Sequence, residues 1–112
     1  MTRAPLFNRR GGETHELEHG EIRLTVTVGF YPDGTPGEVF TSILPGRGRQ
    51  TSAFEASTRD AAILISLCLQ HGVALETLRR AVTRGDHDEP ASVVGAILDS
   101  IRKEGDDGTD RP

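Results

Sequence analysis

The sequence of 112 residues holds one cysteine, Cys68, and no tryptophan, and aromatic residues make up only 4% of it. A single thiol cannot form an internal disulfide, and it offers neither a CxxC pair for redox exchange nor a cysteine set for zinc. We interpret Cys68, which lies in an apolar run, as a small buried hydrophobic residue. No apolar stretch approaches the ~18 residues of a membrane-spanning helix, and no signal-peptide pattern opens the chain. These absences predict a cytoplasmic protein without a membrane partner.

An excess of positive charge is lacking as well. The chain carries 13 Lys and Arg against 17 Asp and Glu, for a formal net charge of -4 and a pI near 5.5. This balance argues against nucleic acid as a partner. The length fits one domain. From composition along the chain we predict a flexible N-terminal segment at residues 1–12, a folded domain at 13–104 and a disordered acidic tail at 105–112.

The first half of the folded part has the alternation of β-strands. From Glu21 to Tyr31 apolar residues fall on every second position, which predicts a long half-buried strand. The dense turn signal PDGTPG follows, with Pro32 suited to the first central position of a turn. Alternation resumes over Glu38–Leu44, and a weaker strand is predicted at Thr14–Glu18. These segments predict a three-stranded antiparallel meander that needs a cover on one face.

The second half supplies the cover as helices. Ser52 and Glu55 have the spacing of a capping box, and the run from Ala61 to Leu69 is apolar almost all round, which predicts a buried helix. Gly72 follows as the helix stop, with His71 in the last turn. Two further helices are predicted from the apolar positions Leu75, Leu78 and Val82 and the positions Val94, Ile97, Leu98 and Ile101. For the last helix, Asp88 is the expected cap and Pro90 the expected first-turn residue. Strands before helices predict the α+β class, with about three helices packed on one face of the meander.

The four histidines do not predict a metal site. His15 and His19 fall on one face of a strand but about 13 Å apart, too far to share one ion, so we interpret both as solvent-facing. His71 is expected to interact with the last carbonyls of its helix. His87 lies in the run Asp86–Glu89, which is either a cation site or, as we prefer, a solvated loop.

The segment Pro45–Ser52, PGRGRQTS, is a candidate phosphate site. Arginine forks and the free N–H groups of a helix start both suit phosphate oxygens. The lysine and spacing of a Walker A loop are missing. The candidate ligands are Arg47, Gly48, Arg49, Thr51 and Ser52. The alternative interpretation is a basic loop that joins a strand to a helix.

The segments GFYPDGTPGEVF and LISLCLQHGVALETL resemble the TSCPD domain, which occurs at the C-terminus of adenosylcobalamin-dependent ribonucleotide reductases and as a short separate protein. The resemblance covers residues 9–101. It begins at Arg9 and Arg10 and resumes near the end at Pro90, Ala91, Ser92 and Asp99. The motif residues of its centre are Gly29, Asp33, Gly34, Gly37, Glu38, Phe40, Ser66, Leu69, Gln70, His71 and Gly72.

Two departures limit what the resemblance implies. The cysteine-bearing stretch that gives the family its name is absent, and nothing resembles the radical-generating barrel, its cysteines or a cobalamin-binding region. The resemblance thus implies an accessory module or subunit in deoxyribonucleotide synthesis that is not catalytic alone. We expect no cofactor bound by this chain alone, with adenosylcobalamin implied only for a catalytic partner. A ribonucleotide reductase catalytic chain is the implied partner.

A second hypothesis belongs to another class of function. It makes the chain a homo-oligomeric binding protein for a nucleotide or another anionic metabolite. With no catalytic chain present, a homodimer or higher oligomer is expected, because one layer of helices on a three-stranded meander cannot bury Ile63, Leu64, Leu67 and Cys68 on all sides. The alternative is a monomer in which the second and third helices cover the first. We expect contacts through the helix around Thr58–Leu69 or through a sheet edge.

Overall fold

A computed structural model describes residues 11–45 and 52–101 of the chain, and its elements follow the predicted order of strands before helices. The fold is therefore α+β, as the sequence predicts. The element bounds are β1 (Gly11–His19), β2 (Ile22–Phe30), β3 (Pro36–Ile43), α1 (Ser52–Gln70), α2 (Leu75–Ala81) and α3 (Val93–Ser100).

The three strands form an antiparallel sheet in the order β1-β2-β3, so the meander is confirmed. β2 is the central strand, and its alternating apolar side chains point to one face and are buried. Val39 extends this apolar face onto β3, at 2% exposure. The buried large apolar residues of β2 are Leu24, Val26, Val28 and Phe30, each at 2% exposure or less.

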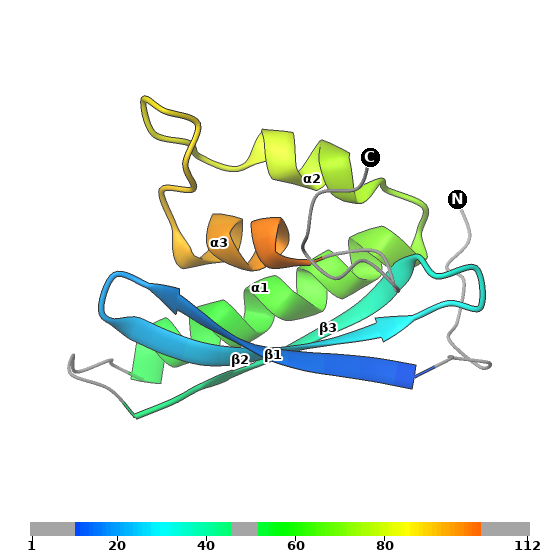
Figure 1. Cartoon of the computed structure of the whole chain (residues 1–112), viewed down its shortest axis with the longest axis horizontal. Coiled ribbons are helices and arrows are strands. Elements are labelled where there is room, and N and C mark those ends of the chain that lie inside the picture. The colour runs from blue at the N-terminus through cyan, green and yellow to red at the C-terminus, as the bar shows by residue number, and fades with distance from the viewer. Residues whose placement is uncertain (1–10, 46–51, 102–112) are drawn as a thin grey trace, which may run out of the picture.

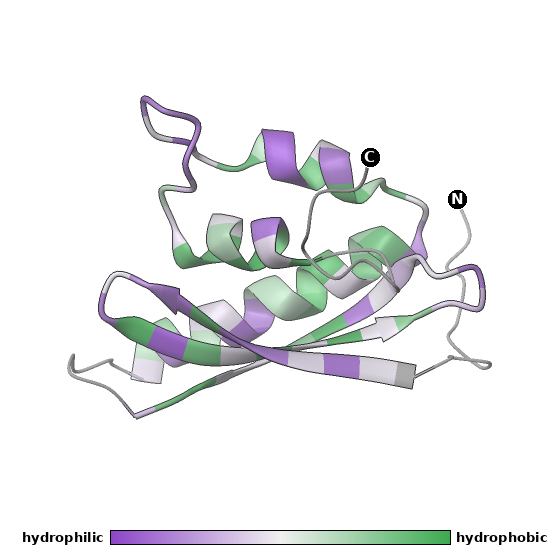
Figure 2. Cartoon of the chain, in the orientation of Figure 1, coloured by the Kyte–Doolittle hydropathy of each residue, from purple (hydrophilic) through white to green (hydrophobic). Residues whose placement is uncertain are grey.

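The helices cover this apolar face of the sheet (Figure 1). α1 packs along β3, α3 contacts both β1 and α1, and α2 lies on α3. α3 and the middle of α1 are mostly apolar, whereas α2 carries more hydrophilic residues (Figure 2). The helical part of the core consists of Ala62, Ile65, Leu69, Val93, Ala96, Ile97, Leu98 and Ile101.

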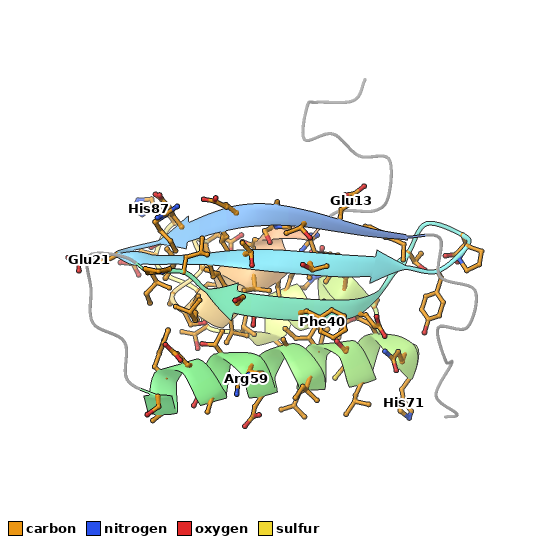
Figure 3. The ribbon with its side chains drawn as sticks, turned by 90° about the horizontal axis from the view of Figure 1, so that it is seen from below. Glu13, Glu21, Phe40, Arg59, His71 and His87 are labelled. Carbon is orange, nitrogen blue, oxygen red and sulfur yellow. The ribbon has the colours of Figure 1, made fainter. Side chains whose placement is uncertain are left out.

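The opposite face of the sheet is open: seen from that side, the strands lie in front of α2 and α3, and α1 lies alongside β3 (Figure 3). Cross-strand neighbours on this face are polar. Thr14 and Thr27 are 2.9 Å apart between their hydroxyl oxygens, and Arg23 pairs with Glu16 at 3.1 Å. Phe40 is the exception, with 55% of its surface exposed.

The prediction that α1 is buried on nearly every face is wrong. Ile63, Leu64 and Leu67 are 51%, 62% and 37% exposed. The reason is the position of the helix at the β3 edge of the sheet (Figure 3), where sheet and helices touch only its inner side. As expected from the small cover, the chain's own elements leave these three side chains uncovered; Cys68 is half-buried.

The predicted start of α3 is wrong too. The helix begins at Val93, and the cap is Ser92, whose hydroxyl accepts a hydrogen bond from the Gly95 N–H at 3.1 Å. Asp88 instead lies in a turn with a positive φ of 64°, and Pro90 forms an isolated bridge with Arg84. The loop thus pairs with itself before the helix starts.

The predicted domain boundaries at 12/13 and 104/105 stay predictions, because residues 1–10 and 102–112 lie outside the described part. Within 11–45 and 52–101, no helix combines the length and the apolar character that crossing a bilayer would require.

Candidate functional site

The motif residues gather where the β2–β3 turn, β3 and the C-terminal half of α1 meet. Ser66 and Gln70 project from α1 to the outer edge of β3. The Ser66 hydroxyl accepts from the Val39 N–H at 2.8 Å and lies 3.2 Å from the Val39 carbonyl oxygen and 2.9 Å from that of Ala62. The Gln70 amide donates to the Gly37 carbonyl at 2.8 Å. α1 therefore closes this part of the sheet edge with side-chain hydrogen bonds.

The β2–β3 turn is built by its predicted residues. The Gly34 N–H donates to the Tyr31 carbonyl at 2.9 Å, which puts Pro32 at the first central position. Asp33 accepts from the Thr35 N–H at 2.9 Å and from its hydroxyl at 2.6 Å. Gly34 has a φ of 89°, a conformation that favours glycine. This turn fixes the start of β3 beside the end of α1.

Gly37 is required by close packing. A Cβ atom at this position would lie 2.5 Å from Cε2 of Tyr31, so the ring rests against the glycine backbone. The next residue of β3, Glu38, lies directly across from Gly29 of β2 in the strand register. These glycines are thus explained by structure, in keeping with the interpretation of the turn as structural.

The C-terminus of α1 completes this region. Gly72 has a φ of 90°, and the Val73 N–H donates to the Cys68 carbonyl at 2.9 Å. Nδ1 of His71 lies 2.9 Å from the Leu67 carbonyl, so it is the protonated nitrogen that donates there. Both the helix stop at Gly72 and the role of His71 at the last carbonyls agree with the sequence prediction.

A groove of about 320 Å³ runs between β3 and α1. Its floor holds Ala62 and the hydrogen-bonded Ser66, and its walls are Phe40, Ile63 and Leu67. Figure 3 shows Phe40 on β3 and Arg59 on α1, both on the open side of the molecule. We call Phe40, Ile63, Leu64 and Leu67 the α1 face. Phe40, Ile63 and Leu67 line the groove, whereas Leu64 lies on α1 outside its lining.

The groove is lined by polar as well as apolar side chains, among them Glu38 and Arg59. Its lining residues in the described part of the chain include no cysteine or histidine, and Ser66 and Gln70 are already engaged in hydrogen bonds with β3. Cys68 is half-buried on the same helix and is not among them. In residues 11–45 and 52–101 no group of three or more metal-ligating side chains comes together.

The candidate phosphate site cannot be placed. Arg47, Gly48, Arg49 and Thr51 lie outside the described residues, and only Ser52, the first residue of α1, is within them. Binding of a phosphate-bearing ligand by this loop stays a prediction.

The sequence analysis interpreted His15 and His19 of β1 as solvent-facing, and the structure corrects this for His15. Nε2 of His15 lies 2.9 Å from the Ser100 hydroxyl oxygen of α3, so His15 faces the helices and the solvent-facing assignment is wrong for it. The reason is the strand's alternation, which puts His15 and Leu17 on the covered face of the sheet. The acidic loop around His87 forms a turn, in which Glu89 accepts from the His87 N–H at 2.9 Å.

An arginine network that the sequence analysis missed joins α2, the following loop and α3. Arg84 donates two hydrogen bonds of 2.7 Å to Asp99 and one of 2.9 Å to the Arg79 carbonyl. Arg79 in turn donates to the carbonyls of Leu98, at 3.0 Å, and Ile101. The hydrogen bonds from Arg84 hold the pKa of the Asp99 carboxyl below its ordinary value. Only Asp99 gave a signal in the sequence, as part of the family resemblance.

Fold and groove together define a small α+β module with exposed apolar residues beside a groove. The chain belongs to the TSCPD domain family, whose model matches residues 5–104. It is similar to a vitamin B12-dependent ribonucleotide reductase of Agrobacterium fabrum (strain C58), with 37% identity over 92 residues. This alignment covers 82% of the chain but 7% of the reductase. No solved structure matches the chain. The resemblance deduced from the motifs is confirmed.

Proposed function

We propose that the chain is a TSCPD module without catalytic activity of its own, which associates with the catalytic chain of a vitamin B12-dependent ribonucleotide reductase in deoxyribonucleotide synthesis. The observation that carries this proposal is the 37% identity to a segment of such a reductase. The matched segment is 7% of the reductase. In this proposal the reaction centre and the cobalamin site belong to the rest of the reductase.

The thiol chemistry supports the absence of catalysis. Ribonucleotide reduction needs a radical-bearing thiol and a reducing dithiol pair, and this sequence has Cys68 alone. Cys68 is half-buried on α1, the helix that is hydrogen-bonded to the edge of β3 through Ser66. Adenosylcobalamin would therefore be bound by the catalytic chain.

The experiment is a binding titration between the purified chain and the catalytic chain of a vitamin B12-dependent reductase from the same cell. Sedimentation velocity is measured with and without adenosylcobalamin. We expect a complex whose mass is the sum of both components. The control is the catalytic chain of a cobalamin-independent reductase, for which we expect no complex.

Two results would contradict the proposal. One is the absence of a complex at about 50 μM of each component, which corresponds to a binding free energy weaker than about -6 kcal/mol. The other is equal binding to the cobalamin-independent catalytic chain, because the association would then lack the specificity that the family relation implies.

A further inference from the structure

We propose that the outer edge of β3 binds an extended segment of a partner protein, which pairs with Thr41 and Ile43 as a short fourth strand. The segment carries an acidic residue and, two positions later, a large apolar residue. This inference goes beyond the proposed function and does not rest on it, because it concerns only backbone and side-chain groups of this chain.

The hydrogen bonds of the sheet determine which backbone groups of β3 point outward. The Leu44 N–H donates to the Arg23 carbonyl at 2.8 Å, so these two residues form a hydrogen-bonded pair between β2 and the end of β3. Hydrogen-bonded and non-hydrogen-bonded pairs alternate along an antiparallel ladder. In the register of β2 and β3, the N–H and C=O groups of Thr41 and Ile43 therefore point away from β2.

α1 occupies this outer edge only in part. The outward groups of Val39 lie within hydrogen-bond distance of the Ser66 hydroxyl, in agreement with the alternation. For the outward groups of Thr41 and Ile43, no hydrogen-bond partner lies within residues 11–45 and 52–101. Unpaired strand edges are templates for pairing, and peptides are often recognised by adding a strand to such an edge. The open stretch is thus Thr41–Ile43, and Ser66 ends it at Val39.

There is room for a chain beside this stretch. The groove of about 320 Å³ borders Thr41, and a second hollow of about 260 Å³ continues along Ser42 and Ile43. Thr41 and Arg59 line both, so the two hollows follow the edge of β3 one after the other. A second copy of this chain fits the space poorly, because its own β3 edge is bordered by its own α1. A single extended segment is therefore the occupant that this edge favours.

The neighbouring side chains define the size of the segment's residues. A fourth strand places every second side chain on the open face of the sheet, beside those of Phe40 and Ser42. Phe40 is 55% exposed and lines the groove together with Ile63 and Leu67, so the residue beside Phe40 is large and apolar. The residue before it, opposite Thr41, points to the covered side of the sheet and is small.

Arg59 determines the charge of the residue beside Ser42. It lies on the open side of the molecule, as Phe40 does (Figure 3), and it forms no ion pair within the described part of the chain. An acidic residue beside Ser42 gives this guanidinium a partner of opposite charge. The carboxylates of Glu38 and Glu55 line the outer ends of the two hollows, and Glu38 is already engaged within the protein. A segment antiparallel to β3 thus has an acidic, a small and an apolar residue in that order.

The test is an NMR titration of the isotope-labelled full chain with a set of acetylated and amidated hexapeptides, Ser-Thr-Glu-Ala-X-Ser, in which X is Val, Ile, Leu or Phe. We expect at least one peptide to shift the amide signals of Thr41 and Ile43 and to slow their exchange, with a dissociation constant of about 1 mM or below. N-methylation of the peptide's alanine, whose N–H bonds to Thr41, should weaken binding by about tenfold or more. N-methylation of X, whose N–H points away from β3, should leave the affinity unchanged.

A double-mutant cycle tests the role of Arg59. Arg59→Gln in the chain and glutamine for glutamate in the peptide should each weaken binding by about threefold to fivefold, and both together by no more than either alone. The matched control is Arg80→Gln on α2, whose side chain is 78% exposed and which should bind the peptide as the parent does.

Three results of the titrations would overturn the inference. They are unshifted Thr41 and Ile43 signals with every peptide at about 5 mM, equal effects of the two N-methylations, and additive effects of the two charge changes. A fourth is a dimer, seen by light scattering without peptide, in which the amides of Thr41 and Ile43 already exchange slowly. The fourth strand would then come from a second copy of the chain.

Discussion

Ser66 shows how one side chain of α1 determines where the helix lies. Its hydroxyl is bonded to the backbone of Val39 and to the Ala62 carbonyl, and it lies on the floor of the groove. The exposed edge of a sheet is otherwise open to pairing with another chain, so this contact also protects β3. A small polar residue within an apolar helix is therefore a structural determinant here.

We predict that Ser66→Ala lowers the free energy of unfolding by about 1–3 kcal/mol, because the Val39 N–H loses its acceptor in a half-buried site. Urea denaturation followed by circular dichroism measures the change. The matched control is Ser57→Ala on the exposed side of the same helix, which should be neutral or slightly stabilising. Equal effects of the two substitutions would show that the bond to β3 contributes nothing.

Gly37 is the second residue whose identity is set by a contact. We predict that Gly37→Ala destabilises the protein by about 1–3 kcal/mol, because its Cβ would meet the Tyr31 ring at 2.5 Å. Gly12→Ala, a strand glycine whose added Cβ would have no neighbour nearer than 3.4 Å, is the control. If thermal unfolding shows the same midpoint for both variants, the Tyr31 ring is not held against Gly37.

At the scale of the elements, the predicted start of α3 at Asp88 and Pro90 was wrong, since the helix begins at Val93. The residue types at Asp88 and Pro90 are typical of a helix start, but the Arg84–Pro90 bridge and the Gly85–Glu89 turn use this segment for a loop. Such pairing depends on residues of one loop meeting in space, which local propensity does not contain. Strand alternation and the glycine stop after α1 depend on local patterns, and these were predicted correctly.

The two candidate caps give a direct comparison. Ser92→Ala should lower the free energy of unfolding by about 1 kcal/mol, since the Gly95 N–H loses its capping acceptor. Asp88→Gly should be neutral or stabilising, because the residue has a φ of 64°. Chemical denaturation of both variants measures this. The reverse order of stabilities would restore Asp88 as the cap.

The Arg84–Asp99 pair joins the loop after α2 to α3 and makes stability depend on pH. The folded pKa of Asp99 lies below its unfolded value, so its contribution is present above the ordinary aspartate pKa of about 3.9 and is lost as the pH falls through the folded pKa. We predict that Asp99→Asn is less stable than the parent at pH 6, and that the difference shrinks as the pH is lowered toward 2.

Urea unfolding at a series of pH values measures this difference. Asp86→Asn, which changes an exposed carboxylate of the same loop, is the control and should leave a much smaller difference at pH 6. A constant gap between parent and Asp99→Asn at all pH values would contradict the role assigned to the Arg84 hydrogen bonds.

At the scale of the whole molecule, the predicted and the unpredicted parts of the site have different physical origins. The turn at Asp33 and Gly34 and the helix stop at Gly72 were predicted because each depends on local sequence, whereas the contact of Gln70 with the Gly37 carbonyl joins residues 33 positions apart and was not predicted. The exposed α1 face could not be predicted from periodicity, since an all-round apolar helix looks the same whether its own chain or another one covers it. Because α1 lies at the sheet edge, the elements of residues 11–45 and 52–101 leave Ile63, Leu64 and Leu67 exposed.

We propose that this TSCPD module takes part in deoxyribonucleotide synthesis without catalysing it. The most direct measurement is deoxyribonucleotide formation from ribonucleotides with adenosylcobalamin and a dithiol reductant. The assay compares the chain alone, a reductase catalytic chain alone and the two together. We predict no product from the chain alone, with or without Cys68→Ala, and turnover by the catalytic chain that changes when the module is added. Product formed by this chain alone and retained in Cys68→Ala would contradict the account.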